Sequence, residues 1–130
     1  MKIWVNGCFD ILHRGHFELF NYAKSLGDFL VVGVDTDEKV AQDKGPDRPY
    51  NKLEDRVYAL ESLKAIDKVY VFDSRERLED LIKLSKPDFL VVGSDWKGKE
   101  VVGGQYAKEI VYFDRMGNYS TTNILNNESK

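Results

Sequence analysis

Short apolar runs rich in β-branched residues recur along the chain and alternate with segments of helical periodicity. Runs of this length and composition predict strands, and their alternation with helical segments predicts parallel strands joined by helical crossovers. The expected strands are Ile3–Val5, Phe29–Val34, Lys68–Phe72, Phe89–Val92 and Glu109–Phe113. The pattern therefore predicts the α/β class, as a Rossmann-like, doubly wound parallel sheet of about five strands with flanking helices.

Three segments between these strands carry apolar residues at helical spacing. The expected helices span about 15–26, 53–65 and 75–84. The first helix is expected to end at Gly27 and to direct Phe17 toward the core. Pro87 disfavours a helical conformation at the residue before it, so the third helix is expected to end before Pro87. Because no linker, repeat or low-complexity stretch interrupts the pattern, residues 1–130 are predicted to form a single domain.

The composition narrows the range of functions. A formal charge of −3 argues against a general nucleic-acid or anionic-membrane binder, since either needs a basic surface. The longest apolar run, Phe29–Val34, is far short of the ~20 residues that cross a bilayer, and the N-terminus does not resemble a secretory signal. Cys8, the sole cysteine, cannot form an internal disulfide. These observations together predict a cytoplasmic protein.

The chain has two histidines, His13 and His16, which lie one helical turn apart just after the first expected strand. This spacing allows a zinc site, but a third protein ligand is not evident, because Cys8 is the only cysteine and the carboxylates are scattered. An isolated pair would ordinarily be polar residues that face water at a helix N-terminus. The residues around the pair indicate an anion site instead.

The string GCFDILHRGH places glycine, aspartate and two imidazoles at the expected N-terminus of the first helix. Unpaired backbone N–H groups and the helix dipole favour a polyphosphate there. The string resembles the signature G-x-F-D-x-x-H-x-G-H of the cytidylyltransferase-like, or HxGH, nucleotidyltransferase superfamily. The matching residues are Gly7, Phe9, Asp10, His13, Gly15 and His16.

The resemblance extends along nearly the whole chain through DTDE, LEDRVYALESLKAIDKV, FLVVGSDWKGK and STTNI. Two branches of the superfamily are similar to it: the adenylyltransferase domain of bacterial ADP-heptose synthases and the glycerol-3-phosphate cytidylyltransferases. The resemblance implies that a substrate phosphate attacks the α-phosphorus of a nucleoside triphosphate and releases pyrophosphate. Because the attacking phosphate is already an anion, the histidines are expected to stabilise transition-state charge as donors, without acting as strong bases.

The resemblance also assigns roles to individual residues. The implied catalytic residues are His13, His16, Lys44 and Arg115. The implied nucleotide-binding residues are Gly7, Cys8, Phe9, Asp10, Gly15, Arg56, Gly93, Asp95, Ser120, Thr121 and Thr122. The implied substrate-binding residues are Asp35, Asp37, Lys64 and Trp96. Mg²⁺ is the expected cofactor, with Asp10 near the metal-bridged phosphates.

Several of these residues also have a purely structural interpretation. Ser120 would ordinarily be a helix N-cap, and Arg56 could pair with an acid on its own helix. Lys44 lies in AQDKGPDRP, which is expected to be a loop that could close over the phosphates, but it could equally be a surface lysine. Trp96 could belong to the core, and Arg115 could be a solvated loop charge.

Three functions are compatible with the sequence. The favoured one joins ATP to a heptose-1-phosphate-like sugar for cell-envelope carbohydrate synthesis, because Lys64 stands where cytidylyltransferases commonly carry arginine. The second is a CTP:glycerol-3-phosphate cytidylyltransferase, indicated by SDWKGK and by Arg115 ahead of STT. The third is a non-catalytic nucleotide sensor, which would more readily show a broken histidine motif. Small enzymes of this superfamily commonly pair, so a homodimer is expected.

Overall fold

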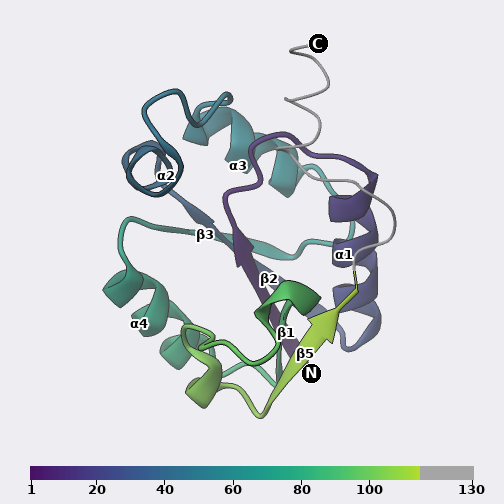
Figure 1. Ribbon diagram of the computed structural model, residues 1–130. Coiled ribbons are helices and arrows are strands. Elements are labelled where there is room, and N and C mark those ends of the chain that lie inside the picture. Colours follow the sequence, from purple (N-terminus) through teal and green to yellow (C-terminus); the bar gives the residue numbers. More distant parts are fainter. Residues whose placement is uncertain (115–130) are drawn as a thin grey trace.

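The computed structural model describes residues 1–114, which form a five-stranded parallel sheet flanked by helices (Figure 1). The strands are β1 (Lys2–Gly7), β2 (Phe29–Asp35), β3 (Lys68–Phe72), β4 (Phe89–Gly93) and β5 (Glu109–Phe113). The helices are α1 (Arg14–Ser25), α2 (Asp37–Lys44), α3 (Leu53–Glu61) and α4 (Arg75–Ser85), with short 3₁₀ helices η1 (Ser94–Trp96) and η2 (Gly104–Tyr106). The strand order is β3-β2-β1-β4-β5, so the predicted Rossmann-like α/β fold class is confirmed.

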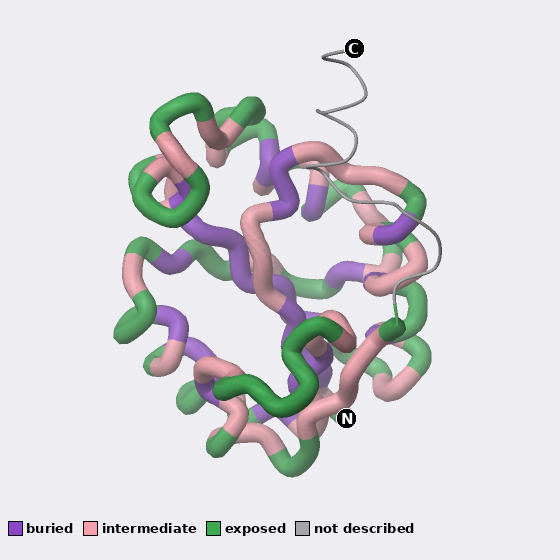
Figure 2. Tube along the Cα trace, viewed as in Figure 1, coloured by how far each residue is buried: buried purple, intermediate pink, exposed green. Residues whose placement is uncertain are grey.

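The sheet separates two hydrophobic cores, because successive residues of a strand point to opposite faces. On one face, Ile3 of β1 packs in a cluster with Phe20 of α1 and Leu60 of α3. On the other face, Trp4 packs in a cluster with Ile82 of α4. Figure 2 shows buried residues concentrated along the central strands. The near-continuous apolar strands therefore follow from burial on both faces.

The direction of winding reverses at the centre of the sheet. From β1 the chain proceeds to β2 and β3 on one side, and it then crosses to β4 and β5 on the other. Backbone pairing between β1 and β2 extends from Lys2 to Gly7, whereas pairing between β1 and β4 covers only Ile3 and Trp4. The strands β1 and β4 therefore diverge toward their carboxyl ends, at the switch point where open α/β sheets bind ligands.

Helix α2 was not predicted from the sequence. It has eight residues, and Val40 alone is buried, so no apolar period marks it. Thr36 caps its N-terminus with the side-chain oxygen, and Gly45 follows its last residue with a φ of 112°. Lys44 is therefore the last residue of a helix, and the prediction that it lies within a loop is wrong.

The other elements agree with the sequence prediction except at their ends. All five expected strands are present, and α3 ends at Glu61, four residues before the predicted end. Phe17 was expected to face inward, but 39% of its surface is exposed. Within residues 1–114, the helices lack the length and apolar character needed to cross a bilayer.

Candidate active site

The segment that leaves β1 begins with a tightly turned stretch, Gly7–Asp10. Phe9 has a φ of 47°, in the left-handed region that residues with side chains rarely adopt. Its buried ring lies so close to Gly7 that a Cβ atom on this glycine would approach it to 3.0 Å. The ring also meets Phe20 and His16 edge-on, with centroid distances of 5.1 and 5.6 Å. Packing thus holds the turn in a strained conformation, as is common at functional sites.

His13 and His16 form a capping box at the N-terminus of α1. Nδ1 of His13 accepts a hydrogen bond from the backbone N–H of Gly15 at 3.1 Å, and Nδ1 of His16 accepts one from the backbone N–H of His13 at 3.2 Å. An imidazole nitrogen that accepts a hydrogen bond carries no proton, so the neutral rings carry theirs on Nε2. The cap therefore makes each histidine an Nε2–H donor, and it holds the two ring centroids 4.0 Å apart.

The electrostatics at this helix end favour an anion. The first turn of α1 contains no acidic residue, so no carboxylate offsets the positive end of the helix dipole there. Two imidazole donors and the positive end of the helix dipole thus lie at a helix start whose first turn carries no carboxylate. This arrangement suits a phosphate group.

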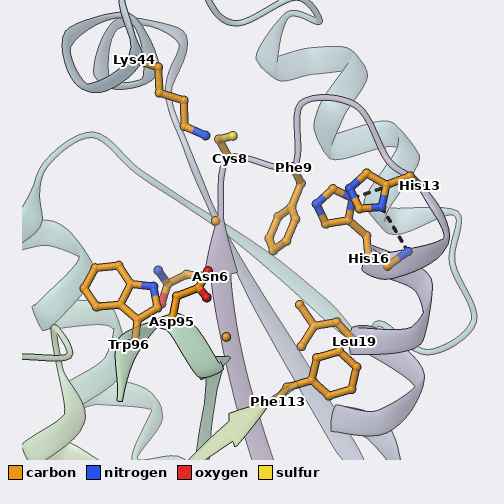
Figure 3. Close-up of a pocket in the computed structure, with 13 residues that line it drawn as sticks. Asn6, Cys8, Phe9, His13, His16, Leu19, Lys44, Asp95, Trp96 and Phe113 are labelled. Carbon is orange, nitrogen blue, oxygen red and sulfur yellow. Dashed lines mark hydrogen bonds between the residues drawn. The ribbon is translucent and has the colours of Figure 1, made fainter. Parts of the chain in front are cut away.

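A cleft of about 380 Å³ opens where β1 and β4 diverge (Figure 3). The predicted site residues that line it are Gly7, Cys8, Phe9, His13, Gly15, His16, Lys44, Gly93, Asp95 and Trp96. The lining residues that the sequence did not single out are Asn6, Leu19 and Phe113. The fold thus brings β1, α1, α2 and the β4–η1 corner to one place.

The cleft has two chemically different sides. Figure 3 shows His13 and His16 on one side, and Asp95 and Trp96 on the other. Lys44 reaches from the end of α2 toward the mouth of the cleft between them. A ligand that spans the cleft would therefore meet imidazole donors at one end, and a carboxylate and an aromatic ring at the other.

Asp10 does not face the cleft. Its side chain is fully buried, and the carboxylate accepts hydrogen bonds from the backbone N–H groups of Tyr50 and Asn51 at 2.7 and 2.8 Å and from Arg48 Nε at 3.2 Å. Asn51 also donates its side-chain amide to the backbone carbonyl of Asp10 at 2.6 Å. The carboxylate therefore ties the segment before α3 to the turn after β1. The predicted magnesium contact at Asp10 does not fit this environment and is corrected to a structural role.

Arg56 is likewise a structural connector. Its side chain has no exposed surface, and Nη1 donates to the backbone carbonyls of Cys8 and Asp35, each at 2.9 Å. Nε donates to the carbonyl of Asn51 at 3.1 Å, and Nη2 donates to Asp37 Oδ1 at 2.7 Å. A guanidinium engaged in this way is not placed to contact a nucleotide, so the predicted nucleotide contact at Arg56 is corrected.

The residues expected to bind the second substrate are scattered. Asp35 is buried at the end of β2, and this burial raises the pKa of its carboxyl group above the ordinary value. Asp37 accepts hydrogen bonds from Arg56 and from the backbone N–H of Leu53, so it joins α2 to α3. Lys64 is exposed in the turn that follows α3, outside the cleft lining. Trp96 alone of the four predicted residues lines the cleft.

Four predicted residues lie outside the described part of the chain: Arg115, Ser120, Thr121 and Thr122.

Position in the sequence offered a signal for the cleft-lining residues that were not predicted. Asn6 immediately precedes Gly7 at the end of β1, and Phe113 ends β5, so both are strand-end residues of the kind expected at a binding edge. Leu19 lies one helical turn after His16 on α1.

The described residues do not build a metal site of their own. Within residues 1–114 there is no group of three or more His, Cys, Asp or Glu side chains that could hold a metal ion. Among the described residues that line the cleft, Asp95 alone carries a carboxylate. Such a donor set suits Mg²⁺ only when the ion arrives with phosphate oxygens and water as its main ligands.

A family model described as cytidylyltransferase-like matches residues 4–127. The chain belongs to the cytidylyltransferase-like family. The resemblance noted in the sequence is confirmed by this match, and with it the prediction that the chain is a nucleotidyltransferase. Enzymes of this kind generally use a divalent metal ion.

Curated relatives of this cytidylyltransferase-like chain include the bifunctional protein HldE of Nitratiruptor sp. and that of Helicobacter hepaticus. They are 51% and 47% identical over 123 residues, which is 95% of this chain in each case. The chain spans about a quarter of the length of these relatives, 26% and 25%.

Solved structures share the fold. A lipopolysaccharide core biosynthesis protein from Thermoplasma volcanium is 24% identical, with a TM-score of 0.69 over 92% of this chain and 98% of that one. A pantoate-beta-alanine ligase from Francisella tularensis, in complex with beta-gamma ATP and beta-alanine, is 17% identical, with a TM-score of 0.67 over 95% of this chain and 64% of that one. At these identities the likeness shows the fold alone.

Proposed function

We propose that the chain transfers the adenylyl group of ATP to a heptose-1-phosphate-like sugar phosphate. A phosphate oxygen of the sugar forms a bond to the α-phosphorus, the bond from that phosphorus to the bridging oxygen breaks, and pyrophosphate leaves. The observation that carries the proposal is the pair of Nε2–H donors that the capping box of α1 holds at the cleft. The identity of 51% to a bifunctional protein HldE supports the sugar class.

In this mechanism the protein binds and aligns the phosphates. His13 and His16 donate from Nε2 to oxygens on which negative charge grows in the transition state, and the N-terminus of α1 adds a favourable field. Lys44 compensates the charge of the leaving pyrophosphate from the mouth of the cleft. The attacking oxygen is already anionic, so no residue has to remove a proton from it.

Mg²⁺ fits this mechanism as part of the nucleotide complex. A divalent ion on the triphosphate would neutralise charge between the phosphate oxygens, which lowers the repulsion against an incoming anion. Asp95 is the cleft carboxylate that could meet such an ion or its bound water. We do not assign a metal contact to Asp10, since its carboxylate is engaged with Arg48, Tyr50 and Asn51.

A second candidate is CTP:glycerol-3-phosphate cytidylyl transfer. The observation in its favour is the position of Asp95 and Trp96, from the stretch SDWKGK, in the cleft lining. ATP is expected to be preferred. Specificity constants for ATP and CTP, measured with heptose 1-phosphate and then with glycerol 3-phosphate, test the choice. A preference for CTP of about tenfold or more would replace the adenylyl proposal with this alternative.

A triphosphate with Mg²⁺ should raise the melting temperature, because a ligand that binds only the folded state stabilises it by mass action. At 100 times the dissociation constant the stabilisation is about 2.7 kcal/mol, which is readily seen by calorimetry. Zinc alone should change the melting temperature little. Stoichiometric zinc in the purified protein, with activity restored by zinc and not by magnesium after chelation, would contradict this prediction.

A homodimer is expected, in accord with two exposed aromatic residues. Tyr58 on α3 is 75% exposed, and Tyr70 on the edge strand β3 is 36% exposed. An edge strand is a common site of pairing between chains. Light scattering should therefore return about twice the chain mass of 15.0 kDa. A value equal to the chain mass at every concentration tested would rule out the dimer.

A further inference from the structure

The orientation of the Asn6 side-chain amide is determined by Trp4. The indole nitrogen of Trp4 lies 3.0 Å from Asn6 Oδ1. An indole N–H can only donate a hydrogen bond, so the atom of Asn6 that faces it must be the carbonyl oxygen. The amide nitrogen, with two N–H donors, therefore points away from the indole.

Trp4 is itself held rigidly. None of its surface is exposed, and its ring stacks on Tyr70 with a centroid distance of 6.2 Å and an interplanar angle of 13°. A Cβ atom on Gly33 of the neighbouring strand would lie 2.8 Å from the ring, so the ring fills the space beside that glycine. The indole donor is therefore fixed in place, and it restrains the rotation of the Asn6 amide.

Asn6 lines the cleft on the side opposite the histidines (Figure 3). Figure 3 shows it on the same side as Asp95 and Trp96. Within residues 1–114 its amide nitrogen donates no hydrogen bond to the protein, whereas its oxygen accepts the one from Trp4. A preoriented donor at the lining of a cleft is the arrangement expected of a group that recognises a ligand.

We propose that Asn6 is a specificity residue that donates from Nδ2 to a hydroxyl or phosphate oxygen of a bound substrate. Trp4 acts as its positioning residue. This inference rests on the proposed function, because it takes the ligands to be a nucleoside triphosphate and a sugar phosphate. The oxygen belongs to one of these two ligands, and binding measurements distinguish them.

The test compares Asn6→Ala, Asn6→Asp, Trp4→Phe and the double variant Trp4→Phe/Asn6→Ala with the wild type. Calorimetry gives the dissociation constants of Mg-ATP, Mg-CTP, heptose 1-phosphate and glycerol 3-phosphate without requiring turnover. Asn21→Ala is the matched control, since Asn21 is an exposed asparagine of α1 outside the cleft. Thermal melting verifies that each variant folds.

Asn6→Ala should weaken the binding of one ligand class about tenfold, in line with the loss of one hydrogen bond, and leave the other class unchanged. Asn6→Asp should weaken it further, because a carboxylate repels a phosphate and cannot donate. Trp4→Phe should weaken binding of the same ligand by about threefold. The double variant Trp4→Phe/Asn6→Ala should bind this ligand as weakly as Asn6→Ala alone, because both changes act through one hydrogen bond. Asn21→Ala should behave as wild type.

The affected ligand class identifies the source of the oxygen: the triphosphates for a nucleotide oxygen, the sugar phosphates for an acceptor oxygen. Unchanged dissociation constants in Asn6→Ala, for ligands that the wild type binds, would overturn the assignment of Asn6 alone. An equal effect of Trp4→Phe in the presence and absence of Asn6 would overturn the positioning role of Trp4. A wild-type protein that binds neither ligand class would overturn the proposed function and this inference together.

Discussion

His13→Ala and His16→Ala should each lower turnover about 10²–10³-fold, which corresponds to the loss of one transition-state donor of about 3–4 kcal/mol. The physical reason is that each Nε2–H group is held ready by a hydrogen bond at Nδ1, at 3.1 Å from Gly15 N and 3.2 Å from His13 N. Preoriented donors need no reorganisation as charge develops. Pyrophosphate release with ATP and a sugar phosphate measures the effect.

The variant His13→Ser separates the donor from the helix cap. Serine is among the preferred N-cap residues, so it should keep the cap of α1, whereas alanine should cost about 1 kcal/mol of stability. Both variants lack the imidazole donor, and both should therefore be equally impaired in turnover. Near wild-type turnover in His13→Ser would mean that the cap is the only role of His13.

Arg56→Ala should lower the free energy of unfolding by about 3–5 kcal/mol, because it leaves the buried carboxylate of Asp35, which lies 4.0 Å from Arg56 Nη1, and backbone carbonyl groups without their partner. Arg56 joins the carbonyls of Cys8, Asp35 and Asn51 to the carboxylate of Asp37 from a fully buried position. Folded domains are stable by only about 5–15 kcal/mol, so the loss is a large share of the total. Urea denaturation followed by circular dichroism measures it.

Arg77→Ala is the matched control for this prediction. Arg77 is an exposed arginine in the first turn of α4, and its removal should change stability by no more than about 0.5 kcal/mol. Arg56→Lys should also be destabilised, because a lysine lacks the planar fork that reaches several acceptors at once. If Arg56→Ala kept wild-type stability and lost nucleotide affinity, a direct phosphate contact would be the better interpretation of Arg56.

The strands were predictable because their signal is local. Each strand is a short apolar run. A strand of a parallel sheet is buried on both faces, so it requires such a run whichever strand it pairs with. The placement of the two histidines at a helix N-terminus was predictable for a similar reason: the residues that build the capping box lie within four positions of one another, from His13 to His16. Local spacing along one helix is visible in a sequence.

Helix α2 shows where local signals were too weak. With Val40 as its one buried residue, it has no apolar face to reveal its period. Its polar composition and the Gly-Pro that follows it favoured a loop, yet within the fold the Thr36 cap, the packing of Val40 and the hydrogen bonds of Asp37 to α3 stabilise the helix. Helical stability in such a segment comes from tertiary contacts rather than propensity.

By itself, the sequence determined the α/β class, the strands and the placement of His13 and His16 at a helix N-terminus, because hydrophobic period and short-range spacing carry that information. Only the tertiary structure decided which charged residues face the cleft. Asp10 and Arg56 meet partners 41 and 48 positions away, Asn51 and Cys8. Because burial of an uncompensated charge is too costly, folding pairs the buried charges of Asp10 and Arg56 with protein groups, and this pairing turns them away from a ligand.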